Sequence, residues 1–182
     1  MTQQAAPPKP PGSLALGFLA VFQDQTGWLG GYLVTNGWGR PLEFRLTTAV
    51  QPNRVQTALY GPTLTEYLHA DVIGKTLVEK TGTKPDLIVT DSPAALALRA
   101  RIEIPVIALS TPGTPPAPET VARSHTRTPG GILLSARFAS DGDLVAQLLE
   151  RVDPAVDLAE PFARIREAVS EARKMGVTNR AA

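Results

Sequence analysis

Hydrophobic residues along the chain form short runs whose spacing predicts a mixed α/β fold. Near the amino end, three segments rich in Leu, Val and aromatic residues follow one another with short polar turns between them. After the second comes Asn36-Gly37, a strong hairpin signal. The three predicted strands are residues 14–23, 28–35 and 42–50. Strands joined by such short turns pair antiparallel, so the pattern predicts a three-strand meander.

The middle of the chain alternates between helical and strand patterns. Helices are predicted at 52–60, 63–82 and 94–100, and strands at 87–90 and 106–109. Thr63 and Glu66 have the spacing of a capping box, and Ser92 followed by Pro93 is typical of a helix start. A strand, a short helix and a second strand within so few residues predict a parallel βαβ crossover unit.

The carboxyl-terminal third begins with a stretch rich in proline, residues 111–131, which we expect to be a long loop. A strand at 132–138 and helices at 144–151 and 161–174 follow, the last with an apolar stripe along one face. The pattern therefore predicts a single α/β domain over residues 13–176. Its mixed sheet opens with the antiparallel meander, continues with the crossover unit and is followed by C-terminal helices. The Pro-rich residues 1–12 and the end at 177–182 are expected to be flexible tails.

The composition excludes several kinds of functional site but identifies none. The 182 residues include 18 basic and 17 acidic ones, so the net charge of +1 gives no sign of a dedicated nucleic-acid binder. The chain has no cysteine, which excludes disulfides, thiolate zinc sites and a cysteine nucleophile. No signal peptide is recognisable, and no apolar run is long enough for a membrane span, so a cytoplasmic location is expected.

Neither of two familiar catalytic or binding motifs is complete in this sequence. Gly74-Lys75-Thr76 resembles the end of a phosphate-binding loop, but the glycine required five residues earlier is replaced by His69, and the segment lies inside a predicted helix. Catalysis by a serine and a histidine lacks the Gly-x-Ser-x-Gly elbow that would fix the nucleophile.

Carboxylates at the ends of predicted elements suggest one enzymatic alternative. Asp24 ends the first strand, Asp71 lies on the helix and Asp91 follows the fourth strand. This order of elements and acids over residues 14–110 resembles the ribonuclease-H-like nucleases. The resemblance implies that Asp24, Asp71 and Asp91, with Asp143 as a late fourth, would bind Mg²⁺ for phosphodiester cleavage. Structural roles compete, because Asp24 suits a turn and Asp91 lies beside an N-cap.

Aromatic residues gather on the predicted hairpin. Aromatic side chains on strands are usually buried in the core, and the alternative is a surface that binds a partner. The partner-binding candidates are Trp28, Trp38, Arg40, Phe44 and Tyr60.

A second resemblance covers a little over a third of the chain. The segments 31–36, 40–44 and 56–61, continuing through 63–68 and 86–98, are similar to a pattern in uncharacterised bacterial proteins. It implies a bacterial origin and a discrete family, with no activity attached.

These observations lead to one favoured hypothesis and two alternatives. The favoured one is a non-enzymatic protein-binding or assembly subunit of a bacterial system that needs no cofactor and has another protein as its partner. The first alternative is the Mg²⁺-dependent, ribonuclease-H-like nuclease, with nucleic acid as a less favoured partner. The second is a small-molecule binder at the parallel strand ends near Asp91-Ser92, where such sheets bind ligands.

Overall fold

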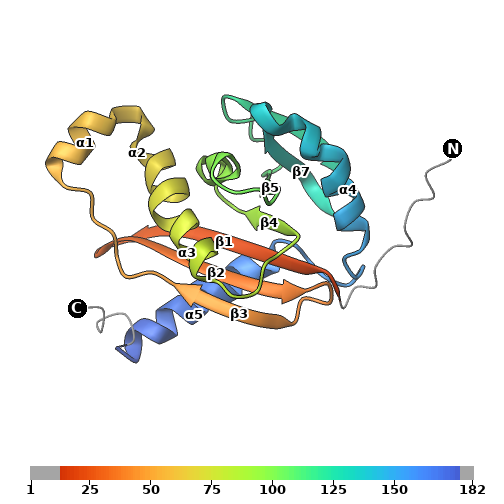
Figure 1. The fold of residues 1–182 in the computed structure, drawn as a ribbon, viewed down its shortest axis with the longest axis horizontal. Helices are drawn as coiled ribbons and strands as arrows, with labels where there is room; N and C mark the ends of the chain where they lie inside the picture. Colours follow the sequence, from red (N-terminus) through yellow and green to blue (C-terminus); the bar gives the residue numbers. More distant parts are fainter. Residues whose placement is uncertain (1–12, 177–182) are drawn as a thin grey trace, which may run out of the picture.

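Seven strands form one mixed sheet in the order β3-β2-β1-β4-β5-β7-β6 (Figure 1). The computed structural model describes residues 13–176, so the predicted tails at 1–12 and 177–182 lie outside the described residues. The strands are β1 (Ala15–Asp24), β2 (Gly27–Asn36), β3 (Pro41–Leu46), β4 (Leu87–Thr90), β5 (Val106–Leu109), β6 (Thr120–His125) and β7 (Thr128–Ser135). The strands β1, β2 and β3 pair antiparallel, whereas β1, β4 and β5 run parallel. This topology confirms the predicted α/β domain with its meander and crossover unit.

Side-chain alternation along the strands divides the core between the two faces of the sheet. One face packs against α4 (Gly142–Glu150) and α5 (Glu160–Lys174), with Phe18 of β1 in edge-on contact with Phe162 of α5 at 5.9 Å between ring centroids. The other face packs against η3 (Tyr67–Gly74), α3 (Lys75–Lys80) and η4 (Pro93–Ala100). Figure 1 shows α3 and α5 on opposite sides of the meander. Within residues 13–176, no helix is both long and apolar enough to cross a membrane.

The capping box predicted at Thr63 does not form. The chain enters this region already helical, through α1 (Arg54–Tyr60), η2 (Gly61–Thr63) and α2 (Leu64–Glu66), and Thr63 itself has helical dihedral angles. Its hydroxyl donates to the carbonyl of Tyr60 at 2.7 Å. The capping box instead lies at the true start, where Asn53 and Gln56 exchange side-chain and backbone hydrogen bonds.

Residues 111–131 contain more regular structure than the expected loop. β6 lies wholly within this stretch, and β7 begins in it; the two strands pair as an antiparallel hairpin at one edge of the sheet. Every residue of β6 is half-buried or exposed, so no hydrophobic run marks this strand in the sequence. Pro129 is the second residue of β7, near the strand start where proline is tolerated. A short helix, η5 (Ala136–Asp141), then takes the place of the end of the predicted strand.

Candidate functional site

Two carboxylates lie at the carboxyl ends of neighbouring parallel strands. Asp24 ends β1 and Asp91 follows β4, and the strand alternation turns both side chains toward the face covered by α5. The register pairs Leu19 with Thr90, so Asp91 lies level with Ala20, four residues before Asp24. At roughly 3.3 Å per residue, the two acids are offset by about 13 Å along the strands. They share a face and an edge of the sheet but not one site.

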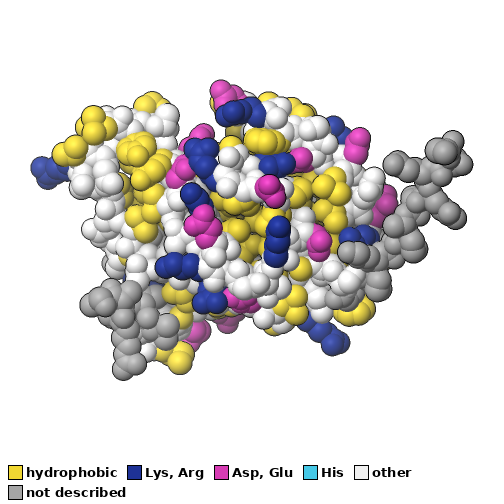
Figure 2. Space-filling model, viewed as in Figure 1, with side chains coloured by type: hydrophobic (Ala, Val, Ile, Leu, Met, Phe, Trp, Pro, Cys, Tyr) yellow, Lys and Arg dark blue, Asp and Glu magenta, His cyan; other side chains and the backbone are white. Residues whose placement is uncertain are grey.

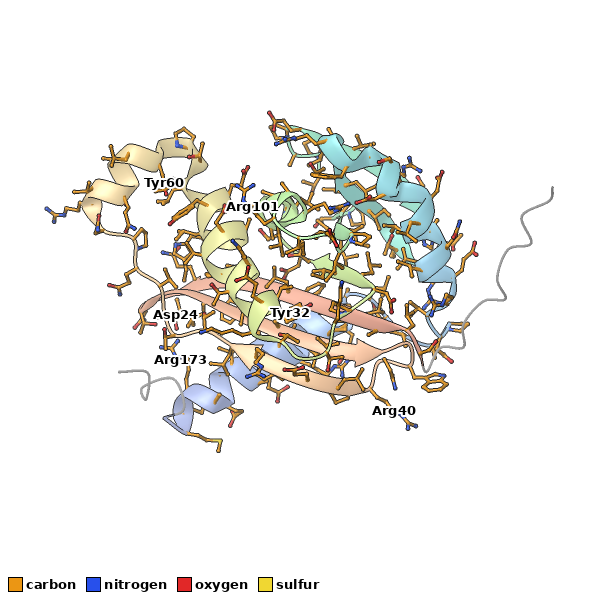
Figure 3. The ribbon with its side chains drawn as sticks, viewed as in Figure 1. Asp24, Tyr32, Arg40, Tyr60, Arg101 and Arg173 are labelled. Atoms are coloured by element: carbon orange, nitrogen blue, oxygen red, sulfur yellow. The ribbon has the colours of Figure 1, made fainter. Side chains whose placement is uncertain are left out.

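Helix α5 supplies an arginine to each of these carboxylates. Arg173 forms an ion pair with Asp24, and Arg166 forms one with Asp91. The two arginines are seven residues apart, which is about two helical turns or 10 Å of rise, so their spacing follows that of the acids. Figure 3 shows Arg173 and Asp24 side by side at this edge. A guanidinium group therefore neutralises each carboxylate where a cation would otherwise be needed.

Asp71 belongs to the opposite side of the molecule. It lies on η3, which packs on the sheet face away from α5, and it pairs with Arg101 at 2.6 Å. In Figure 3, Arg101 lies well apart from Asp24. Asp143 lies on α4 and pairs with Arg123 at 3.3 Å. Among residues 13–176, no group of three or more His, Cys, Asp or Glu residues is arranged to hold a metal ion. The acids of the nuclease alternative are thus not brought together.

Two hollows adjoin the same sheet edge, separated by the Asp91–Arg166 pair. The first, which we call the basic hollow, has a volume of about 550 Å³ and three cationic side chains among its lining residues. It is lined by Phe22, Asp24, Leu29, Arg166, Val169, Ser170, Arg173 and Lys174. The guanidinium of Arg166 lies 5.5 Å from the centre of the Phe22 ring, a cation–π distance.

The second hollow, which we call the strand-end pocket, has a volume of about 390 Å³. It lies beyond the carboxyl ends of β4 and β5, between the start of β7 and the start of α5. Its lining residues are Asp91, Leu109, Ser110, Thr111, Pro112, Arg127, Thr128, Pro129, Gly130, Asp157, Leu158, Ala159 and Phe162. The walls are mostly apolar, and the charged residues among them are Asp91, Arg127 and Asp157. The concave site expected by the small-molecule alternative is therefore present.

A buried histidine sits behind Asp91 on the other face. His69 is 4% exposed, and its Nδ1 atom shares a hydrogen bond of 2.8 Å with the Ser92 hydroxyl. Trp28 contacts the imidazole edge-on at 5.0 Å between ring centroids. Burial lowers the pKa of His69 to about 4, and the charge of Asp91 opposes part of that shift. At neutral pH the ring is uncharged and links η3 to the end of β4.

Sequence reasoning did not predict this contact. Ser92 has the position of an N-cap, but its hydroxyl makes no capping bond and faces His69 instead. The residues around His69 form a π-helix, whose wider turn rotates side chains away from the positions that a 3.6-residue period predicts.

The partner-binding candidates do not form one surface. Trp28 and Phe44 are half-buried and pack against cores on opposite faces of the sheet. Trp38 is 49% exposed in the turn after β2. Trp28 lies near the other end of that strand, about 26 Å from Asn36 where the strand ends, and Arg40 follows Trp38 on the surface. Tyr60 stacks on Tyr67 at 4.1 Å between ring centroids. On the face drawn in Figure 2, basic and acidic side chains are interspersed.

Comparisons with known proteins return structures but no sequence relatives. No protein-family model and no curated protein matches the sequence. The fold is similar to endonuclease V from Streptomyces avermitilis, with a TM-score of 0.54 and 13% identity over 95% of this chain and 87% of that chain. Endonuclease V from Bacillus subtilis aligns with a TM-score of 0.49 and 13% identity, covering 97% of this chain and 88% of that chain.

This similarity corrects two predictions. The favoured hypothesis of a non-enzymatic protein-binding or assembly subunit is wrong, because the shared fold is that of a protein described as an endonuclease and favours the nuclease alternative. The expectation of no cofactor is corrected in the same direction, since the ribonuclease-H-like alternative includes Mg²⁺. The residues that the sequence offered for that metal nevertheless do not fit it, because Asp24, Asp71 and Asp91 lie apart and each is paired with an arginine.

Proposed function

We propose that this protein acts on nucleic acid, which it binds along the edge formed by the carboxyl ends of β1 and β4 beside α5. The observation that carries the proposal is the pair of adjoining hollows at this edge, on a fold similar to that of an endonuclease. In open sheets with parallel strands, ligands bind outside the carboxyl ends of those strands.

The chemistry of the basic hollow supports a single strand as the ligand. Arg166, Arg173 and Lys174 line it together with one carboxylate, Asp24, and Phe22 offers an aromatic surface. Proteins that bind single strands combine cationic grooves with aromatic groups on which bases stack. Because the arginines already hold carboxylates, strand phosphates would have to share or replace these partners, so we expect modest affinity with a shallow salt dependence.

No metal-dependent step follows from the acids of the sequence hypothesis. A two-metal centre requires carboxylates around ions about 4 Å apart, and the offset of Asp24 and Asp91 together with the opposite location of Asp71 prevents this. We therefore expect Asp71→Asn, a change outside the basic hollow, to leave Mg²⁺-dependent cleavage by the purified protein, where it is measured, at the wild-type level.

Fluorescence anisotropy with labelled single-stranded and duplex oligonucleotides at several salt concentrations tests the binding proposal. The double variant Arg173→Ala/Lys174→Ala should weaken single-strand binding and lower the slope of log K against log salt by about one to two. The matched control is Lys80→Ala/Lys84→Ala, which removes two cations outside the hollow near the amino end of β4. Absence of binding at low salt, or equal losses in both double variants, would overturn the proposal.

A further inference from the structure

A third hollow, which we call the turn hollow, lies between the turn after β2 and the segment that joins α4 to α5. It has a volume of about 390 Å³ and is lined by Trp38, Arg40, Asp153, Ala155 and Val156. The backbone N–H of Asp153 donates to the carbonyl of Gly37 at 2.9 Å, which holds the two walls together. The hollow is therefore built from two segments that are far apart in the sequence and fixed to each other.

The side chains of the turn hollow are only partly used by contacts within the protein. Trp38, at 49%, is the most exposed aromatic residue within residues 13–176. The guanidinium of Arg40 has no hydrogen-bond or ion-pair partner in that part of the chain. The carboxylate of Asp153 accepts from the backbone N–H of Ala155 at 2.9 Å, and no cation of the described residues neutralises it. The hollow thus offers an aromatic surface, free donors and one negative charge.

The chain that precedes residue 13 joins the sheet beside this hollow. Antiparallel pairing of Ala15 with Asn36 places the amino end of β1 next to the turn that follows β2. Leu14, which is 1% exposed, belongs to the apolar cluster against which Val156 packs. Residues 1–12 are therefore attached within a short reach of the turn hollow.

The sequence of this attached segment matches the lining of the turn hollow. It contains the run Ala6-Pro7-Pro8-Lys9-Pro10-Pro11. Such a run favours the polyproline II conformation, which docks in grooves lined by aromatic side chains and leaves its backbone carbonyls free to accept hydrogen bonds. Six residues in this conformation span about 19 Å, enough to cross the hollow. Trp38 can receive a proline ring, Arg40 can donate to a carbonyl, and Asp153 is opposite in charge to Lys9.

We propose that the turn hollow is the docking site of the Pro-rich residues 5–12 of this same chain, with proline rings against Trp38 and Lys9 beside Asp153. A segment tethered beside its own site has an effective concentration of about millimolar, which favours it over the same segment of a second molecule.

The docking leaves the proposed nucleic-acid edge free. The ten residues of β1 separate the two ends of the sheet by about 30 Å. Figure 3 shows Arg40 at one of these ends and Asp24 at the other. The inference therefore does not depend on the proposed function, and either can fail without the other.

Acrylamide quenching of tryptophan fluorescence in the full chain tests the docking. The sequence has two tryptophans, so Trp28→Phe leaves Trp38 as the only reporter. The tail variant, made in that background, preserves the length and charge of the segment and consists of Pro7→Ser/Pro8→Ser/Pro10→Ser/Pro11→Ser. It should raise the quenching constant of Trp38 about twofold, because the indole ring loses its apolar cover.

Three controls accompany this measurement. Pro115→Ser/Pro116→Ser removes two exposed prolines that do not line the turn hollow, and it should leave the quenching constant unchanged. The tail variant made in the wild-type chain should show the same rise, reduced by the constant contribution of Trp28, which covers the case that Trp28→Phe does not fold. The protection of Trp38 should also be independent of protein concentration, since segment and site belong to one molecule.

The outcomes separate the docking from its alternatives. A rise in quenching that is confined to the tail variant and independent of concentration would support the proposal. Equal quenching with and without the four tail prolines would overturn it. Protection that is lost on dilution would assign the hollow to the segment of a second molecule and overturn docking within one chain. An equal rise in Pro115→Ser/Pro116→Ser would reveal a general effect of proline loss and overturn the proposal as well.

Discussion

The buried imidazole of His69 makes the stability of the fold depend on pH in a calculable way. Its Nε2 atom has no hydrogen-bond partner within residues 13–176, and burial lowers the pKa from 6.5 to about 4. As the pH falls, the His69 imidazole is therefore protonated near pH 6.5 in the unfolded chain but only near pH 4 in the folded protein. Because the folded pKa is the lower one, stability is complete above pH 6.5 and is lost as the pH falls. The two pKa values give a loss of about 2 kcal/mol between pH 7.5 and 5.

Urea denaturation followed by tryptophan fluorescence at pH 7.5, 6 and 5 measures this loss. His69→Gln keeps a polar side chain but cannot titrate, so it is the matched control for the carboxylates, whose contributions both proteins share. The difference in unfolding free energy between wild type and variant should shrink by about 2 kcal/mol over this interval. An equal pH dependence in the two proteins, or an NMR titration of His69 with a pKa near 6.5, would refute the reasoning.

Two further predictions concern the packing of α5 on the sheet and the hydrogen bonds of Glu43. A Cβ added at Gly31 would lie 2.3 Å from Ile165 of α5, so Gly31→Ala should cost about 1–3 kcal/mol in urea denaturation. A Cβ at Gly82 meets only ordinary contacts, and Gly82→Ala should change stability little; equal effects would contradict the close packing of α5. Backbone N–H groups of the turn after α3 and the side chain of Arg45 lower the pKa of Glu43 to about 2. Glu43→Gln should therefore lower the melting temperature at pH 7, and the deficit should vanish as the pH approaches 2; a deficit independent of pH would contradict this.

Helix α5 determines what the edge of the sheet can do chemically. By placing Arg166 and Arg173 against Asp91 and Asp24, it converts two carboxylates into ion pairs that line two adjoining hollows. The edge is consequently suited to recognise charged and hydrogen-bonding groups of a ligand.

Local patterns predicted most of the fold because they depend on near neighbours. The strands of the meander, β4, β5 and the two long C-terminal helices follow from hydrophobic spacing and turn residues, which act within a few positions. The prediction weakened where an element is polar or unusually wound. β6 has no buried residue. The π-helix around His69 has more residues per turn than an α-helix, so the hydrophobic spacing of an α-helix does not predict it.

In the candidate site, too, local sequence predicted some features and long-range packing decided the others. The sequence by itself determined that Asp24 ends the first strand and that Asp91 follows the fourth. It also gave Asp24 a turn role, and its carboxylate accepts from the backbone N–H of Thr26 at 2.7 Å. Only the tertiary structure made these two strands neighbours. Only the tertiary structure decided that arginines 149 and 75 residues away would neutralise these acids. It also decided that Asp71 would face the other side of the sheet. Charge pairing depends on which surfaces pack together, and that follows from long-range burial of apolar faces, which one sequence does not encode in its local pattern.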